Sequence, residues 1–378
     1  MNKIFKTIAI QVVIILLSLN SVNGQRINLQ FNPIPASFNI NLPNSVYATD
    51  INYDSIDISK QAFHVFLPDT SGTFPLVIFI HGGGFISGSR DYVLNVPNRK
   101  ADVKYFLENG VAYASIGYRL IKNNQADTIG VIKCLMDCKR ALQFIRFYSS
   151  SLHINPRRVA LTGSSAGAGT SLWLATIPDM ANPNDSDPVR KESTRVSAAA
   201  VLGCQATYDL YRWETDVFQN FDGQGTGFTL DSMINFLGFQ RYSNFYGGID
   251  SAYQILYDPF LIQYRHDVDM LYHISNDDPP LYINNPSMAI HPNQDPLHHS
   301  LHAGEIHTAA LNSSLVEVKA LIPAIGVNTT QGESINEFIV RHLTNPTSVQ
   351  KVFTDKIVLT AQNYPNHFNS HTTIRWKS

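Results

Sequence analysis

A serine flanked by glycines, in Gly163-Ser-Ser-Ala-Gly167, is the sequence feature with the clearest chemical potential. It follows an apolar run at 159–162 that predicts a strand, and a helical pattern begins directly after it. Glycines at the outer positions permit a strand-to-helix turn so tight that the central residue, Ser165, projects as a nucleophile. The chemistry expected of such a serine is attack on the carbonyl carbon of an ester.

A second glycine run, His81-Gly-Gly-Gly-Phe85, also follows an apolar run, at 76–80. Attack on an ester carbonyl creates an oxyanion that must be met by aimed N–H donors. The backbone N–H groups of Gly83 and Gly84, together with that of Ala166, are the predicted donors. Each motif alone has a simpler explanation, a chance match or a plain glycine turn. Both follow strands in the order that the mechanism needs, which favours the catalytic interpretation.

The elements that must position these motifs alternate between strands and helices. Helical spacing of apolar residues predicts helices over 131–147 and 335–343. Such alternation predicts an α/β fold, a mostly parallel sheet covered by helices on both faces. The predicted strands are 62–67, 76–80, 111–116, 159–162, 198–202, 281–283 and 316–321.

One segment, about 208–273, departs from this alternation. It contains 16 Phe, Tyr and Trp residues in 66, about twice the proportion in the whole chain. An aromatic insertion between two sheet strands is expected to form a cap that walls a pocket. The alternative is that its rings only pack the insertion's own small core.

The two glycine motifs and the run Gly117-Tyr-Arg-Leu120 give the chain a family resemblance. It resembles α/β-hydrolases of the esterase/lipase type, near the hormone-sensitive-lipase-like and BD-FAE (feruloyl esterase-like) groups, over roughly residues 60–343. The resemblance implies an α/β-hydrolase fold with Ser165 as nucleophile, and with Gly83, Gly84 and Ala166 as oxyanion donors. It also implies that His81 braces its loop. No cofactor is expected.

A serine nucleophile needs a histidine base and a carboxylate that orients it. The resemblance places the acid after the strand that follows the cap, where Asp295 is the first carboxylate. Asp277 and Asp278 precede that strand and are expected in a turn. The histidine is expected in the loop after the last strand, residues 323–334, but that loop contains none.

Histidines gather instead just after Asp295. If a helix starts near Pro296, His298 and His302 share one face at i, i+4 and His299 joins His302 at i, i+3. Three interpretations stay open: His298 or His299 is a displaced catalytic base, the cluster and Asp295 bind zinc, or these are surface histidines without a task. The five histidines between 291 and 307 are His291, His298, His299, His302 and His307.

Composition narrows the class of protein. The 378 residues include 28 basic and 30 acidic side chains, for a net charge of −2, so no nucleic-acid partner is expected. Hydrophobic residues make up 44% and charged ones 15%, which excludes a disordered chain. Three cysteines are too few for a disulfide scaffold.

The two ends of the chain predict export. Residues 1–24 are typical of a signal peptide, with Lys3 and Lys6 before an apolar run and a cleavage site before Gln25. That run is about a dozen residues, shorter than the ~20 of a membrane span. The hydrolase domain is then 25–350, and the mature protein is expected to be secreted, periplasmic or on the outer surface.

The tail, 351–378, contains Asn363-Tyr-Pro-Asn-His-Phe-Asn and then Thr-Thr-Ile. These some 15 residues resemble the start of the C-terminal sorting domain of type IX secretion in Bacteroidota, with His367 in place of the usual second proline. The resemblance implies contact with secretion machinery. The alternative is a polar tail with one edge strand.

The sequence therefore predicts a secreted serine hydrolase that cleaves a small-molecule carboxylic ester. Ser165 attacks, His299 or His298 is the base, and Asp295 orients it. The competing hypothesis is an impaired α/β-hydrolase that binds ligand without turnover, because residues 323–334 lack a histidine.

Overall fold

The computed structural model describes residues 27–219, 227–289, 291–315 and 317–345. Within these ranges ten strands form one sheet in the order β1-β2-β3-β5-β4-β6-β7-β8-β9-β10. The six strands from β5 to β9 in this order run parallel, and β2, β3 and β10 pair antiparallel with their neighbours. The strands are β1 Asn32–Pro33, β2 Val46–Asn52, β3 Ala62–Leu67, β4 Phe74–Ile80, β5 Ala112–Ile116, β6 Ile154–Ser164, β7 Ala198–Leu202, β8 Leu281–Asn284, β9 Val318–Ile322 and β10 Val327–Asn328.

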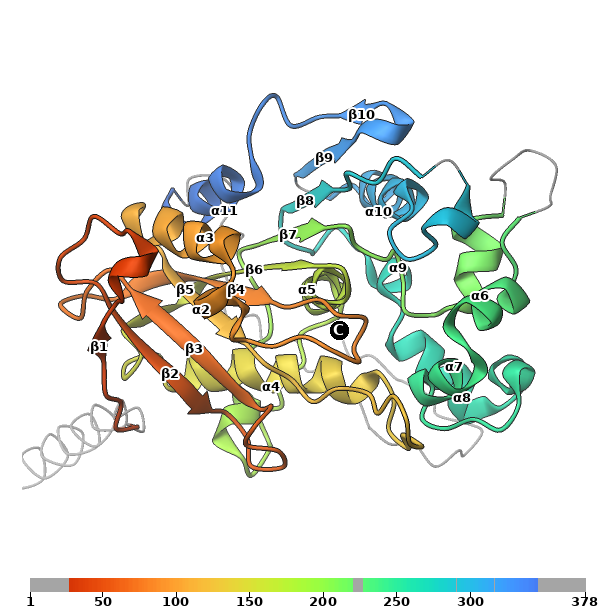
Figure 1. The fold of residues 1–378 in the computed structure, drawn as a ribbon, viewed down its shortest axis with the longest axis horizontal. Helices are drawn as coiled ribbons and strands as arrows, with labels where there is room; N and C mark the ends of the chain where they lie inside the picture. The colour runs from red at the N-terminus through yellow and green to blue at the C-terminus, as the bar shows by residue number, and fades with distance from the viewer. Residues whose placement is uncertain (1–26, 220–226, 290, 316, 346–378) are drawn as a thin grey trace, which may run out of the picture. The chain divides into compact units, whose positions relative to one another are not determined.

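Helices cover both faces of the sheet (Figure 1). Helices α4 and α5 pack with Ile78 and Ile80 of β4 in one buried cluster, and α3 and α11 pack with Val77 and Phe79 in another. Alternate residues of one strand thus face opposite layers, as strand geometry requires. The α-helices are α2 Tyr92–Asn95, α3 Pro97–Glu108, α4 Ile132–Phe147, α5 Ala166–Thr176, α6 Leu230–Leu237, α7 Phe239–Phe245, α8 Pro259–Asp267, α9 Met270–His273, α10 Ser300–Asn312 and α11 Ile335–Thr344.

The register of the central strands sets where the glycine motifs lie. Ile80, the last residue of β4, pairs with Gly163 of β6 in parallel register. The loop that begins at His81 and the turn at Ser165 therefore leave the same edge of the sheet. Leu202 of β7 pairs with Asn284 of β8, so the next two loops emerge at that edge as well.

The aromatic insertion lies between β7 and β8 and contains α6 to α9, which gather at one end of the sheet (Figure 1). Two buried carboxylates hold it: Asp209 accepts from Arg265 and Asp269 accepts from Arg212, with N–O distances of 2.8 and 2.7 Å. The rings do pack a core of their own, since Tyr242 and Tyr246 are buried with centroids 5.4 Å apart. Others, including Tyr257 and Phe260, stay exposed.

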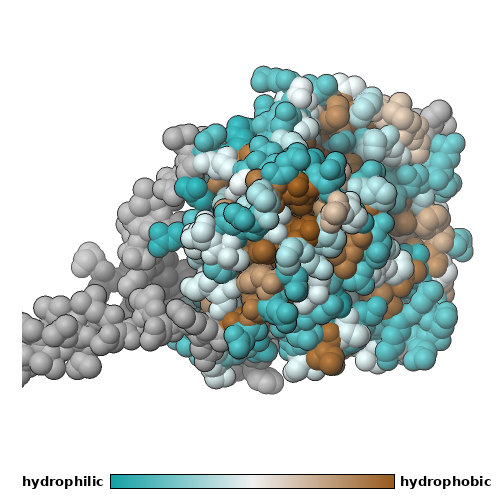
Figure 2. All heavy atoms as spheres, turned by 60° about the vertical axis from the view of Figure 1, so that its left-hand side comes forward, coloured by the Kyte–Doolittle hydropathy of each residue, from teal (hydrophilic) through white to brown (hydrophobic). Residues whose placement is uncertain are grey.

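All seven predicted strands lie within or overlap strands of the sheet, and the α/β class is confirmed. The predicted helix starting near Pro296 is wrong at its start, because α10 begins only at Ser300. Val316, the first residue of the last predicted strand, lies outside the described residues. Residues 1–24 and 351–378 lie outside them as well, so the expectations for the two ends of the chain stay predictions. None of the helices in the described ranges is long and apolar enough to cross a bilayer. Figure 2 shows one face, mostly hydrophilic, with apolar side chains in small groups.

Candidate active site

Ser165 occupies the turn between β6 and α5 in a strained backbone conformation, with φ 53° and ψ −124°. Residues other than glycine rarely adopt a positive φ, and the surrounding structure must hold them there. The turn has no room for side chains beside it. A Cβ on Gly163 would lie 2.4 Å from the Gly167 carbonyl oxygen, and one on Gly167 would lie 2.0 Å from that of Ile80. Glycine at positions 163 and 167 is therefore required by packing.

The glycine loop after β4 lies directly against this turn. A Cβ on Gly82 would lie 3.2 Å from the Ser165 Cβ. Gly83 and Gly84 both have positive φ, 120° and 58°. Among the described residues neither donates its N–H in a hydrogen bond, and Ala166 is the first residue of α5, where the N–H has no helical acceptor. The three predicted oxyanion donors thus flank the serine with uncommitted N–H groups.

His298 is the histidine that lies against Ser165. Its Nε2 lies 2.9 Å from Ser165 Oγ, and its Nδ1 lies 3.2 Å from Asp295 Oδ1. With the Nδ1 proton donated to the carboxylate, Nε2 presents a lone pair to the serine hydroxyl. The structure thus brings three predicted residues into one hydrogen-bonded chain. Acid and base come from a single loop after β8, whereas the resemblance implied a base after β9.

Three buried side chains fix this loop by binding three consecutive carbonyl oxygens. His302 of α10 donates to Pro296, Gln205 after β7 donates to Leu297, and Asn285 after β8 donates to His298, at 2.9, 2.7 and 3.0 Å. Each donor is at most 5% exposed. Ser287 adds a 3.1 Å hydrogen bond to Asp295 Oδ2. The histidine is therefore held from three different elements.

Sequence reasoning missed Gln205, Asn285 and Ser287 in this role. The available signal was weak: Gln205 and Asn285 are polar residues just after the predicted strands 198–202 and 281–283. Polar side chains at the carboxyl ends of parallel strands often surround a site. Gln205 and Asn285 bind backbone carbonyl oxygens 92 and 13 residues away, and no residue pattern identifies such acceptors.

His299 does not occupy the place predicted for an alternative base. It is the N-cap of α10, and its Nδ1 accepts the backbone N–H of Leu301 at 3.3 Å. The ring is only 2% exposed and lies edge-on to Phe218, with centroids 5.6 Å apart. The structure thus places His298 against Ser165 and His299 at the start of α10.

The zinc interpretation of the cluster does not fit His302. Its Nδ1 accepts the N–H of Ala206 at 3.2 Å while its Nε2 donates to the Pro296 carbonyl, so neither nitrogen offers a lone pair to a metal. Its predicted helical face with His298 does not exist, since α10 begins after His298. In the described ranges, possible metal ligands converge at Asp50, His64 and Asp91, where Arg90 already binds Asp50.

His81 begins the glycine loop after β4 and is 1% exposed. Its ring stacks on Tyr118 with centroids 4.3 Å apart, and its Nδ1 donates to the Gly82 carbonyl at 2.8 Å. Tyr118 in turn donates its hydroxyl to the His81 carbonyl at 2.8 Å. These contacts brace the loop, in the manner that the resemblance implied.

Burial of two histidines makes stability depend on pH. Burial lowers the pKa of His302 to about 3 and that of His81 to about 4, below the value near 6.5 of an unfolded chain. Both bind protons more readily when unfolded, so their contribution is full above pH 6.5 and is lost as pH falls toward 4. We expect the free energy of unfolding, measured in urea, to drop by several kcal/mol between pH 7.5 and pH 4.5.

The matched variant for this prediction is His302→Gln, whose amide can still donate to the Pro296 carbonyl. It is expected to be less stable than the parent at pH 7.5 but to show a shallower dependence on pH. An unfolding free energy that is the same in both proteins at pH 7.5 and pH 5, or a slope unchanged by the substitution, contradicts the assignment.

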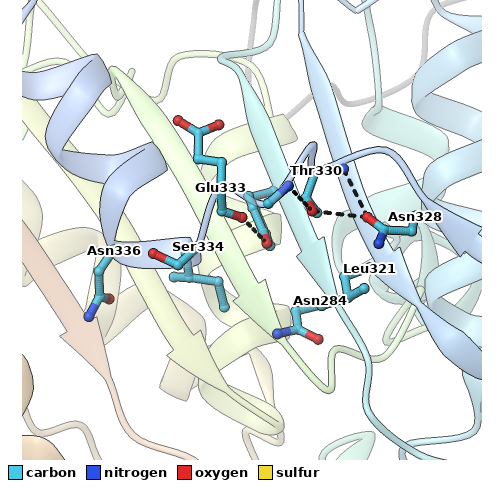
Figure 3. Close-up of a pocket in the computed structure, with 10 residues that line it drawn as sticks. Asn284, Leu321, Asn328, Thr330, Glu333, Ser334 and Asn336 are labelled. Carbon is cyan, nitrogen blue, oxygen red and sulfur yellow. Dashed lines mark hydrogen bonds between the residues drawn. The ribbon is translucent and has the colours of Figure 1, made fainter.

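The hollow in Figure 3 is separate from these residues. It lies between β8, β9 and the start of α11, and Asn284, Leu321, Asn328, Glu333 and Asn336 are among its lining side chains. Several of its polar groups already have partners: Thr330 donates to Asn328 within the hollow at 2.9 Å, and the Glu333 carboxylate binds Arg341 outside it at 2.7 Å.

Comparison with solved structures identifies the architecture. A truncated carbohydrate esterase from gut microbiota superimposes with a TM-score of 0.54 at 13% identity, covering 79% of this chain and 96% of that one. A bifunctional GH43-CE protein of Bacteroides eggerthii gives 0.53 at 16% identity, over 78% of this chain and 38% of the other. This chain has the α/β-hydrolase fold. The alignment with the Bacteroides eggerthii protein covers less than half of that protein's length.

Two sequence matches supplement the structural comparison. The BD-FAE family model matches residues 63–235, just under half of this α/β-hydrolase. That stretch contains the oxyanion loop and Ser165 but ends before Asp295 and His298. A non-reducing polyketide synthase of Stereocaulon alpinum is 28% identical over 132 residues, which are 32% of this chain and 5% of the synthase. Family match and fold together support an esterase-type α/β-hydrolase.

Proposed function

We propose that this α/β-hydrolase cleaves carboxylic esters through an acyl-enzyme on Ser165, as expected from its sequence. The observation that carries the proposal is the continuous hydrogen-bonded chain from Ser165 Oγ through His298 to Asp295. The uncommitted N–H groups beside the serine and its strained conformation support it further.

In the acylation half, Ser165 Oγ attacks the acyl carbon as His298 Nε2 takes the hydroxyl proton. The carbonyl oxygen becomes an oxyanion that accepts hydrogen bonds from Ala166, Gly83 and Gly84. Preorganised donors of this kind are worth roughly 10²- to 10³-fold in rate each. The bond to the alcohol oxygen then breaks, and His298 returns the proton to the leaving alcohol.

In the deacylation half, water attacks the acyl-enzyme while His298 takes a proton from it, and the carboxylic acid leaves as Ser165 recovers its proton. The side chains of His298 and Asp295 are 36% and 34% exposed, so water reaches the base directly. The contacts of Gln205, Asn285 and His302 keep the base in place while its charge changes.

The proposal is tested with para-nitrophenyl acetate and butyrate in rapid-mixing experiments. We expect turnover above the buffer rate and a burst of nitrophenol equal to the enzyme concentration wherever deacylation is slow. An acyl group found by mass spectrometry on the peptide containing Ser165 supports the mechanism. Turnover absent from a folded sample on every ester tried argues for the ligand-binding hypothesis instead.

The specific observation that favoured a non-catalytic binding protein was the histidine-free loop at 323–334. With His298 paired to Ser165, that loop has no bearing on whether a base is present. Ester hydrolysis is therefore the function that the site supports best.

We also propose that the enzyme acts outside the cytoplasm, on small-molecule esters, after cleavage of residues 1–24. The charged start, the short apolar run and the small residues before Gln25 support this. The test is the N-terminal sequence of the protein recovered from its own cells and medium. A start at Gln25 is expected, and an intact Met1 contradicts it.

We propose as well that residues 351–378 take part in secretion. Deletion of these residues is expected to retain the protein in the cell, and unchanged secretion contradicts this role.

A further inference from the structure

Arg241 of α7 reaches from the aromatic insertion to the oxyanion loop. Its Nη2 lies 3.3 Å from the carbonyl oxygen of Gly84. A Cβ on Gly84 would lie 2.4 Å from the same nitrogen, so the guanidinium occupies the space that a side chain would fill. Absence of a side chain at this position thus both permits the positive φ of 58° and admits the arginine.

This arginine differs from the other two in the insertion. Arg212 binds Asp216 and Asp269, and Arg265 binds Asp209, all at 2.7 to 2.8 Å. Within the described ranges no carboxylate pairs with Arg241, and the Gly84 carbonyl accepts its one hydrogen bond. Four of its five donors are left for other partners.

The position of Arg241 is within reach of a substrate on Ser165. Gly82 contacts the serine, and Gly84 follows two residues later, a span of at most roughly 7 Å. The guanidinium therefore lies on the order of 10 Å from the nucleophile, a distance that an ester can span when its carboxylate is about five bonds from the scissile carbonyl. Partial burial lowers the pKa of Arg241. A bound anion offsets the free-energy cost of burying the guanidinium charge, because hydrogen bonds between charged partners are stronger than those between neutral ones.

We propose that Arg241 binds a carboxylate carried by the ester substrate, so that the enzyme prefers anionic esters. This inference rests on the proposed function, since it names the substrate class of the same site. The planar guanidinium matches a carboxylate with two parallel N–H donors, which an ammonium group does not offer. Carboxylates on the acyl chain and on the alcohol fit the same chemistry, and two pairs of substrates distinguish them.

The first pair carries the charge on the acyl side: the para-nitrophenyl monoester of adipic acid against para-nitrophenyl hexanoate. The second pair carries it on the alcohol: meta-acetoxybenzoate against meta-acetoxybenzamide. For each pair the measured quantity is the ratio of kcat/KM for the anionic ester to that for the neutral one. The variants are Arg241→Met and Arg241→Lys, and the control is Lys191→Met. That control removes one positive charge from an exposed residue that precedes β7, at the opposite end of the strands.

In at least one pair, Arg241→Met is expected to lower the ratio by about 10- to 100-fold, as for loss of a charge-assisted bond. The ratio for Arg241→Lys is expected to lie between those of the parent and of Arg241→Met, and the ratio for Lys191→Met is expected to equal that of the parent. The pair that responds identifies the side of the ester that carries the charge.

Equal losses on anionic and neutral esters in both pairs overturn the proposal, because a residue that only positions the Gly84 loop affects both alike. Ratios that Arg241→Met leaves unchanged overturn it too. Failure of the proposed function is distinct, since the parent protein then hydrolyses none of the four esters.

Discussion

Replacement of Ser165 by alanine is expected to lower kcat for para-nitrophenyl butyrate by at least about 10⁴-fold, with the protein still folded. The loss is large because the substitution removes the nucleophile, and the base and oxyanion donors then have nothing to activate. Steady-state kinetics together with circular dichroism of both proteins make the measurement. Retention of more than a tenth of the parent rate contradicts the assignment of Ser165.

A second variant separates activity from folding at this position. Ser165→Gly is expected to be as inactive as Ser165→Ala but more stable than the parent by about 1 kcal/mol. Glycine adopts the φ of 53° without the strain that a side chain brings, and such strain costs of order 1–3 kcal/mol. A gain in stability with loss of function identifies the strain as part of the catalytic design. A glycine variant less stable than the alanine variant contradicts that explanation.

The same substitution at two adjacent histidines is expected to give opposite results. His298→Asn removes the imidazole that is bonded to both Ser165 and Asp295, and should lower kcat by about 10⁴-fold or more. His299→Asn should keep kcat within about 10-fold of the parent, because asparagine is also an effective N-cap and can accept the N–H of Leu301.

Thermal unfolding is the accompanying control for this pair. His299 is buried and His298 is partly exposed, so the larger change in Tm is expected for His299→Asn. Activity and stability thus move in opposite order across the two variants. A greater loss of kcat in His299→Asn than in His298→Asn, both measured on folded protein, refutes the choice of base.

The nucleophile and the oxyanion loop are predictable from the sequence because local geometry dictates their residues. A positive φ, a close approach of backbones and a strand-to-helix turn each require glycine at fixed spacing. The strands were predictable for a similar reason, since a central strand such as β4 is buried on both faces and reads as one apolar run. Strand β2, which lies second in the sheet between β1 and β3, has exposed polar residues and an irregular register and gave no such signal.

The choice between His298 and His299 was not predictable because it depends on where α10 begins. A start at Pro296 places His298 and His302 on one helical face, whereas the observed start at Ser300 leaves His298 in a turn aimed at Ser165. Contacts from Gln205, Asn285 and His302 to consecutive carbonyls fix that turn. All but the last join segments distant in the chain, which sequence patterns do not reveal.

The central claim is that His298 activates Ser165 even though residues 323–334, which follow β9, contain no histidine. A fluorophosphonate probe tests it directly, because it phosphonylates a serine only where a base takes the hydroxyl proton and oxyanion donors meet the phosphoryl oxygen. Intact-mass analysis of the purified protein is expected to show one added probe, mapped to Ser165, and none in His298→Asn. A folded parent protein that gains no mass, or a His298→Asn variant labelled as fast as the parent, contradicts the claim.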